Sequence, residues 1–167
     1  PLYPQYSSAA TGSSIEEVMR IVSKMEVIPS VSIIRDFYQH PAYIFSQVQL
    51  IKNYIGNGVH LLFSYHGIPE RQILKSSCEK ICSGFCASVS MNNQGCYRAQ
   101  CYQTSYLIAQ ELKLSSNQYS TSFKSRLGKI PWIKPYTDEI LKDLIEKGVK
   151  HLAVACPLLQ RIVLRLL

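Results

Sequence analysis

One histidine follows a short, mostly apolar run in the middle of the chain. Residues 59–64 have the composition of a buried parallel strand, and Gly67 and Pro69 mark its end. His66 is therefore expected where the carboxyl end of a strand meets a loop, the edge at which open α/β sheets bind ligands. An imidazole there can accept a proton or bind a metal ion, and the alternative is a purely structural histidine.

The cysteines are the second group of residues that could do chemistry. Four of them are separated by three, three and nine residues: Cys78, Cys82, Cys86 and Cys96. Four thiolates in one segment can hold an iron–sulfur cluster or a tetrahedral zinc ion, although this spacing is not a common zinc signature. Free reduced cysteines are the alternative. Cys101 and Cys156 are interpreted as packing residues, on a helix and at a strand end.

Helices and strands alternate around these candidates. Apolar residues at helical spacing predict helices at residues 13–22, 41–55, 101–112 and 137–147. Strands are predicted at residues 31–34, 59–64, 119–123 and 151–155, and loops at residues 1–10 and 68–95. This alternation predicts an α/β fold whose parallel sheet is covered by helices on both faces.

Helix ends also carry local signals. Ser13 and Glu16 form a candidate capping box, and Pro41 suits the first turn of a helix. Thr137 is a candidate N-cap, and Gly148 is expected to end the last helix.

Composition excludes several classes of protein. The chain has 167 residues, of which 47% are hydrophobic and 17% charged, as in one globular domain. The net charge is +7, but lysine and arginine are scattered and form no nucleic-acid motif, so no nucleic-acid partner is expected. A basic surface suits an acidic small molecule instead. No apolar run approaches the roughly 20 residues of a membrane span, and no signal peptide is evident, so we expect a cytoplasmic location with at most peripheral membrane contact.

The sequence around His66 resembles that of a known family. Residues 63–70, FSYHGIPE, are similar to the Ser-x-His-x-x-Pro motif of ferrochelatases, which insert ferrous iron into a porphyrin in haem biosynthesis. Five further segments resemble ferrochelatase in the same order: PLYPQYS at 1–7, CYRAQC at 96–101, SFKSRLG at 122–128, PW at 131–132 and KPYTDE at 134–139. A chelatase that puts cobalt or nickel into another tetrapyrrole is the alternative enzyme. The PQYS and KPYTDE segments favour the iron enzyme.

The resemblance implies a fold and a site. It implies two Rossmann-like halves with a porphyrin cleft between them. Residues 1–58 would complete the first half, and residues 59–157 would begin the second, with a cysteine-containing insertion at 70–96. His66 would act as the base that removes pyrrole protons, or as a ligand of the incoming ferrous iron. The porphyrin would be protoporphyrin IX or coproporphyrin, and its candidate binding residues are Tyr3, Ser125, Arg126 and Trp132.

The resemblance also bears on the cysteines and on two positions at which this chain differs from the family. Some ferrochelatases carry a [2Fe–2S] cluster on cysteines of an internal segment, which makes that cluster a candidate cofactor here. The family usually has glutamine where this chain has Lys124, and often has tryptophan near Tyr38. Tyr6 and His40 are weaker candidates, because each could equally be structural.

Residues 158–167 do not resemble the family. The family continues with a segment that ends in Glu-Thr-Leu, whose glutamate faces the histidine across the porphyrin. Codons that are permitted for residues 158–167 encode that segment when they are read one base over, so we interpret these residues as an out-of-frame tail. The alternative is an amphipathic C-terminal helix. Because ferrochelatases are longer, we expect an incomplete fold and no activity of this chain by itself; a decayed remnant or a non-catalytic iron–sulfur module is the non-enzyme alternative.

Overall fold

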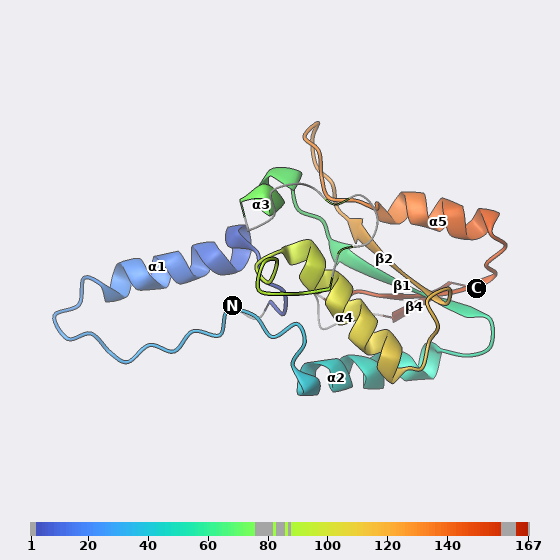
Figure 1. Ribbon diagram of the computed structural model, residues 1–167, viewed down its shortest axis with the longest axis horizontal. Coiled ribbons are helices and arrows are strands. Elements are labelled where there is room, and N and C mark those ends of the chain that lie inside the picture. Colours follow the sequence, from blue (N-terminus) through green and yellow to red (C-terminus); the bar gives the residue numbers. More distant parts are fainter. Residues whose placement is uncertain (1–2, 76–81, 83–85, 87, 158–162, 167) are drawn as a thin grey trace.

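A four-stranded sheet forms the centre of the protein. The computed structural model describes residues 3–75, 82, 86, 88–157 and 163–166. β1 (Val59–His66) lies between β2 (Tyr119–Lys124) and β3 (His151–Ala155), and all three strands are parallel (Figure 1). β4 (Val163–Leu166) pairs antiparallel with the outer side of β3. The α/β fold with a parallel sheet that the sequence predicts is confirmed.

β1 is covered by helices on both of its faces. On one face the Tyr65 hydroxyl lies 3.0 Å from Ser105 Oγ of α4 (Tyr97–Glu111). On the other face Ser64 Oγ lies 2.9 Å from Thr137 Oγ1 of α5 (Thr137–Glu146). Because both faces are covered in the middle of the strand, three successive residues there are apolar: Leu61, Leu62 and Phe63.

The main core lies on the α4 face of the sheet. Leu61, Phe63 and Tyr65 of β1 are fully buried there against Cys101 and Ile108 of α4. α2 (Pro41–Ile51) packs on the outside of α4 and is followed by a short 3-10 turn (Lys52–Tyr54). No helix in the described part of the chain has the length and apolarity needed to cross a bilayer.

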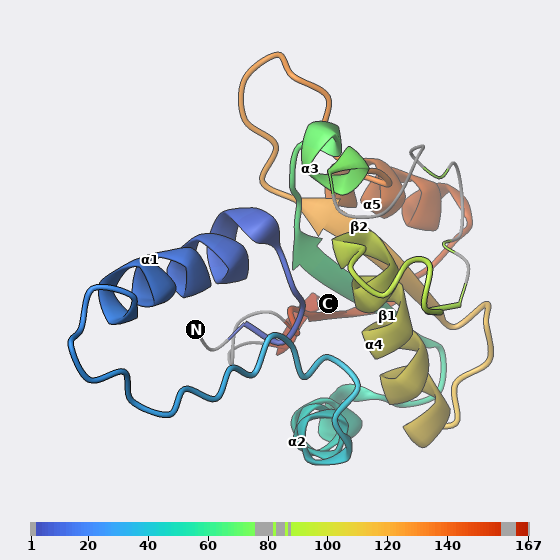
Figure 2. The same cartoon turned by 60° about the vertical axis from the view of Figure 1, so that its left-hand side comes forward.

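α1 and the segment that follows it project away from the sheet. A π-helical turn (Ser8–Gly12) leads directly into α1 (Ser13–Val22), and both views show α1 and the chain after it extending to one side (Figures 1 and 2). α1 has no buried residue, and Val18, Met19 and Ile21 of its apolar stripe are about half exposed.

The prediction of a strand at residues 31–34 is wrong. These residues have no regular secondary structure, and Ile34 remains 72% exposed. β-branched residues favour a pleated surface, but a strand also needs a neighbouring strand to bond with, and the described chain brings none to this segment.

Several local predictions also need correction. Ser13 does not cap α1, because the π-helical turn precedes it and its hydroxyl donates to the Ala9 carbonyl at 2.9 Å. Thr137 does not cap α5, where Tyr136 holds that position. A short helix α3 (Glu70–Leu74) lies within the predicted loop, and β4 occupies part of the C-terminal segment for which a helix was the alternative. Pro41 does begin α2, and Gly148 follows α5 with a left-handed φ of 77°.

Candidate functional site

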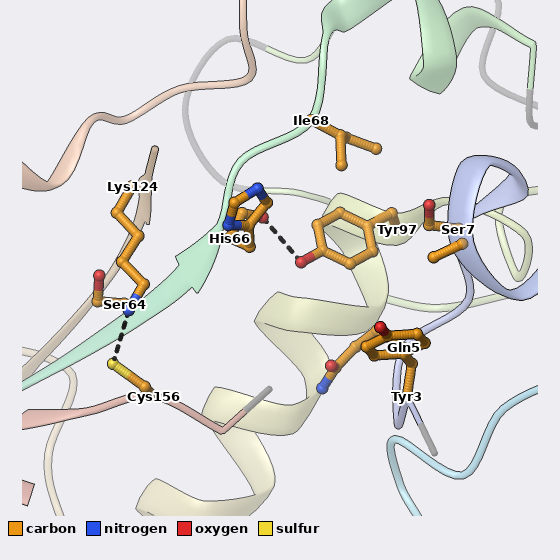
Figure 3. Close-up of a pocket in the computed structure, with 10 residues that line it drawn as sticks. Tyr3, Gln5, Ser7, Ser64, His66, Ile68, Tyr97, Lys124 and Cys156 are labelled. Atoms are coloured by element: carbon orange, nitrogen blue, oxygen red, sulfur yellow. Dashed lines mark hydrogen bonds between the residues drawn. The ribbon is translucent and has the colours of Figure 1, made fainter. Parts of the chain in front are cut away.

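A cavity opens at the carboxyl ends of the parallel strands. Its volume is about 310 Å³. The residues that line it are Tyr3, Gln5, Ser7, Ala10, Ser64, His66, Ile68, Tyr97, Lys124 and Cys156 (Figure 3). His66 ends β1, Lys124 ends β2 and Cys156 directly follows β3. The cavity therefore lies at the sheet edge predicted from the sequence, and it contains two of the predicted site residues, His66 and Tyr3.

The position of His66 is fixed by its backbone. The Tyr97 hydroxyl donates to the His66 carbonyl oxygen at 2.8 Å, and burial raises the pKa of Tyr97 well above its usual range, so this hydroxyl keeps its proton. His66 is the β-sheet partner of Lys124. Because paired residues of parallel strands project on the same face, both side chains lie on one side of the cavity. The imidazole itself is exposed and lines the cavity (Figure 3).

Gly67 permits the close approach of β1 and β2 beyond His66. Its backbone N–H donates to the Lys124 carbonyl oxygen at 2.7 Å. A Cβ on Gly67 would lie 3.0 Å from that same oxygen and 3.4 Å from Cε3 of Trp132. A side chain at this position would therefore push apart the two strand ends that carry His66 and Lys124.

A chain of buried hydroxyls reaches the cavity wall from the α5 side. Ser122 Oγ donates to the Phe63 carbonyl at 3.3 Å, and Thr137 Oγ1 lies 2.9 Å from both Ser122 Oγ and Ser64 Oγ. With one proton each, these hydroxyls can share their bonds in one direction, with Ser64 donating to Thr137, Thr137 to Ser122 and Ser122 to the Phe63 carbonyl. In that arrangement Ser64 Oγ keeps lone pairs that can accept a further hydrogen bond.

Three of the predicted binding residues lie outside the cavity lining. Arg126 donates to Asp138 Oδ2 at 2.6 Å and stacks 4.3 Å above the Tyr136 ring. Trp132 donates its indole N–H to the Leu127 carbonyl at 2.9 Å. Ser125 has a left-handed φ of 67° at the start of this loop. Their roles toward a porphyrin stay predictions.

Two of the four clustered cysteines are in contact. Cys86 and Cys96 are joined by a side-chain hydrogen bond, which together with burial raises the pKa of Cys86. The buried Arg98 guanidinium lies 2.7 Å from Cys86 Sγ. Cys82 is half-buried, and Cys78 lies outside the described residues. Within the described ranges, no three His, Cys, Asp or Glu side chains come close enough to hold a metal ion.

The other two cysteines differ from each other. Cys101 is completely buried in α4, as a packing residue should be. Cys156 is only half-buried and lines the cavity, where Lys124 Nζ lies 3.3 Å from its sulfur. Its interpretation as a packing residue is therefore corrected.

The weaker candidates have structural roles. His40 caps α2, with its Nδ1 accepting from the Ala42 N–H at 3.3 Å. Tyr38 is 4% exposed, and its carbonyl accepts from Thr104 Oγ1 at 2.9 Å. The Tyr6 ring lies under the Arg35 guanidinium at 5.4 Å. None of these three residues lines the cavity.

Sequence reasoning did not single out several lining residues. Gln5 donates to Thr104 Oγ1 of α4 at 3.0 Å, which ties the N-terminal loop to the cavity. Ser64, Tyr97 and Gln5 all occur within the segments that resemble the family, and that resemblance is the signal that could have identified them.

The comparisons with known proteins agree with these segments. The sequence model of the ferrochelatase family matches residues 1–158. A ferrochelatase of Legionella pneumophila is 60% identical over 157 residues, which cover 94% of this chain and 47% of that protein. A ferrochelatase of Coxiella burnetii is 45% identical over 162 residues and is covered to 45%. The chain thus spans about half the length of these relatives. By the family match and these identities, the chain belongs to the ferrochelatase family.

Proposed function

We propose that this chain supplies the histidine-bearing part of an enzyme that inserts ferrous iron into protoporphyrin IX or coproporphyrin. The observation that carries this proposal is His66 at the carboxyl edge of the parallel sheet, exposed in a cavity that belongs to a ferrochelatase-family chain. A cavity of about 310 Å³ is at the lower end of ligand sites, which span about 300–1,000 Å³, so by itself it would hold part of a flat macrocycle.

Iron insertion requires two pyrrole protons to leave the macrocycle, so the cavity must provide a proton acceptor. No carboxylate occurs among the described lining residues. Tyr97 keeps its proton because burial raises its pKa, and a lysine is ordinarily a cation at neutral pH. Among the remaining lining groups, an imidazole is the side chain that most commonly accepts a proton near neutral pH, so we assign the pyrrole proton to His66. The acceptor lone pairs of Ser64 can receive a hydrogen bond from a second pyrrole N–H.

A chimeric enzyme tests this proposal. Residues 1–157 of this chain would replace the matching segment of the Legionella pneumophila ferrochelatase, and ferrous iron insertion into protoporphyrin would be followed by absorbance. We expect the chimera to be active and the 167-residue chain alone to be inactive.

The histidine is then tested within the chimera. His66→Ala is expected to lower the rate by about 100-fold or more, as for loss of a general base. The matched control is His151→Ala, because His151 is exposed and begins β3 at the opposite edge of the sheet. A His66→Ala chimera that metallates porphyrin at the parental rate would contradict the assignment.

We also infer that the clustered cysteines hold a [2Fe–2S] cluster. The contact between Cys86 and Cys96 supports this, and the adjacent Arg98 guanidinium would balance the negative charge of thiolate ligands. The ligands would be Cys78, Cys82, Cys86 and Cys96. When bound, the cluster supplies a one-electron redox centre.

The cluster is tested by its absorption and composition. The chimera is expected to show visible absorption with matching iron and acid-labile sulfide, and Cys86→Ala should remove both. Cys101→Ala is the matched control, because Cys101 is buried in α4 away from the proposed ligand set. A preparation that contains zinc, or no metal at all, would contradict the inference.

We infer a cytoplasmic location from the same side chains. Cys82, Cys86, Cys101 and Cys156, which belong to the described part of the chain, form no disulfide there. Cysteines that form no disulfide suit a reducing compartment.

A further inference from the structure

The cavity carries one positive charge and no negative charge among its described lining residues. Lys124 is the single lysine or arginine that lines it, and neither aspartate nor glutamate does. The other titratable residues of the described lining are His66, Cys156 and two tyrosines, and the rest cannot ionise. An ammonium group in such a cavity is attracted to whatever anionic group enters.

Lys124 has no carboxylate partner in the described part of the protein. The ion pairs found there are all made by arginine. The Lys124 ammonium instead lies 3.3 Å from Cys156 Sγ, and a thiol sulfur is a weak hydrogen-bond acceptor. An anion can therefore replace Cys156 as the partner of Lys124 with a large gain in attraction.

The nearby Arg126 is not equivalent. It lies two residues further along the same segment, but its guanidinium is paired with Asp138 and stacked on Tyr136, and it does not line the cavity. Of these two cations, Lys124 is the one that faces the cavity (Figure 3).

We propose that Lys124 is the carboxylate-binding residue of the cavity. Because its ammonium lies 3.3 Å from Cys156 Sγ, the bound carboxylate would lie on the Cys156 side of the cavity. Identifying that carboxylate as one of a porphyrin rests on the function proposed above; binding of a carboxylate by itself does not.

Cys156 provides a probe next to the ammonium. Iodoacetate and iodoacetamide alkylate thiols by the same reaction, but only iodoacetate carries a carboxylate. Trypsin releases Cys156 in the peptide of residues 151–161, so mass spectrometry can measure both alkylation rates at this one thiol in the 167-residue chain. Any change in thiol acidity affects both reagents alike, so the ratio of the two rates reports attraction for the carboxylate.

Lys124→Gln is expected to lower the iodoacetate-to-iodoacetamide ratio about fivefold, the factor that one unit charge at about 4 Å produces in water. Lys124→Arg should keep the ratio, because it keeps the charge. Lys129→Gln is the matched control, since Lys129 is exposed and outside the cavity lining. A ratio in Lys124→Gln equal to that of the parent overturns the proposal. Concentrated urea unfolds the chain and separates Lys124 from Cys156. If the iodoacetate-to-iodoacetamide ratio of the parent chain is the same with and without urea, the proposal is also overturned.

Porphyrin binding separates this inference from the proposed function. In the chimera, fluorescence titration should show that Lys124→Gln weakens binding of protoporphyrin but not of its dimethyl ester, which lacks the free carboxylates. A chimera that fails to bind or metallate porphyrin, but shows the fivefold change at Cys156, contradicts only the porphyrin function. A chimera that metallates porphyrin with an unchanged ratio contradicts only the role of Lys124.

Discussion

Replacing Gly67 by alanine should separate the two strand ends that carry the cavity residues. The new Cβ would lie 3.0 Å from the Lys124 carbonyl oxygen, which cannot yield freely because it already accepts the Gly67 N–H at 2.7 Å. Cε3 of Trp132, at 3.4 Å, would be a second close contact of the new Cβ. Overpacking of this kind costs about 1–3 kcal/mol, and alanine regains about 0.4–1 kcal/mol by restricting the unfolded chain. A net loss of about 1–2 kcal/mol is expected.

Urea unfolding followed by circular dichroism measures this loss. Gly56→Ala is the matched control, because a Cβ there meets no atom within 4 Å. That control should be neutral or slightly stabilising. In the chimera, Gly67→Ala should also reduce porphyrin metallation, since His66 and Lys124 would move apart. Equal unfolding midpoints for the two variants would refute the argument that a backbone contact excludes a side chain at Gly67.

Two further changes test the α5 side of the sheet. Thr137→Val keeps the side-chain volume but leaves Ser64 and Ser122 without their shared partner, so the free energy of unfolding should fall by about 1–3 kcal/mol in urea titrations; no change would contradict the hydroxyl chain. Burial lowers the pKa of His60, so the unfolded chain binds a proton more readily than the folded one, and stability should decrease as pH falls below about 6.5. Unfolding measured across this pH range should show a slope of at most about 1.4 kcal/mol per pH unit from this residue, and His60→Gln should flatten it; an unchanged slope would contradict the assignment.

Two of the parallel strands, β1 and β3, contain short apolar runs that predict them from the sequence, whereas β2 was predicted from its alternating pattern. β1 is the clearest case, with Leu61, Leu62 and Phe63 all fully buried. Residues 31–34 have a similar composition, yet they form no strand. A strand depends on its neighbour, and composition carries no record of that neighbour.

The site could be predicted only in part for a related reason. His66 was found because its whole motif is local, from the strand to the glycine that ends it. The pairing of Lys124 with Cys156 joins the ends of β2 and β3, which are separated by β1. Such a contact depends on the register of three strands, and no local pattern encodes that register. The same applies to Thr137, whose type suggested a helix cap but whose hydroxyl bonds to Ser64 and Ser122 on two different strands.

The apolar residues between α1 and α2 have a practical consequence. Val27 is 85% exposed, Ile28 65% and Ile34 72%, on a segment that lies apart from the sheet (Figure 2). Exposed apolar side chains are poorly solvated by water. Two molecules that associate through this segment therefore gain free energy by burying these side chains. We therefore expect the yield of monomeric protein in a purification to be limited by aggregation through the segment between α1 and α2, while the β-sheet core remains folded.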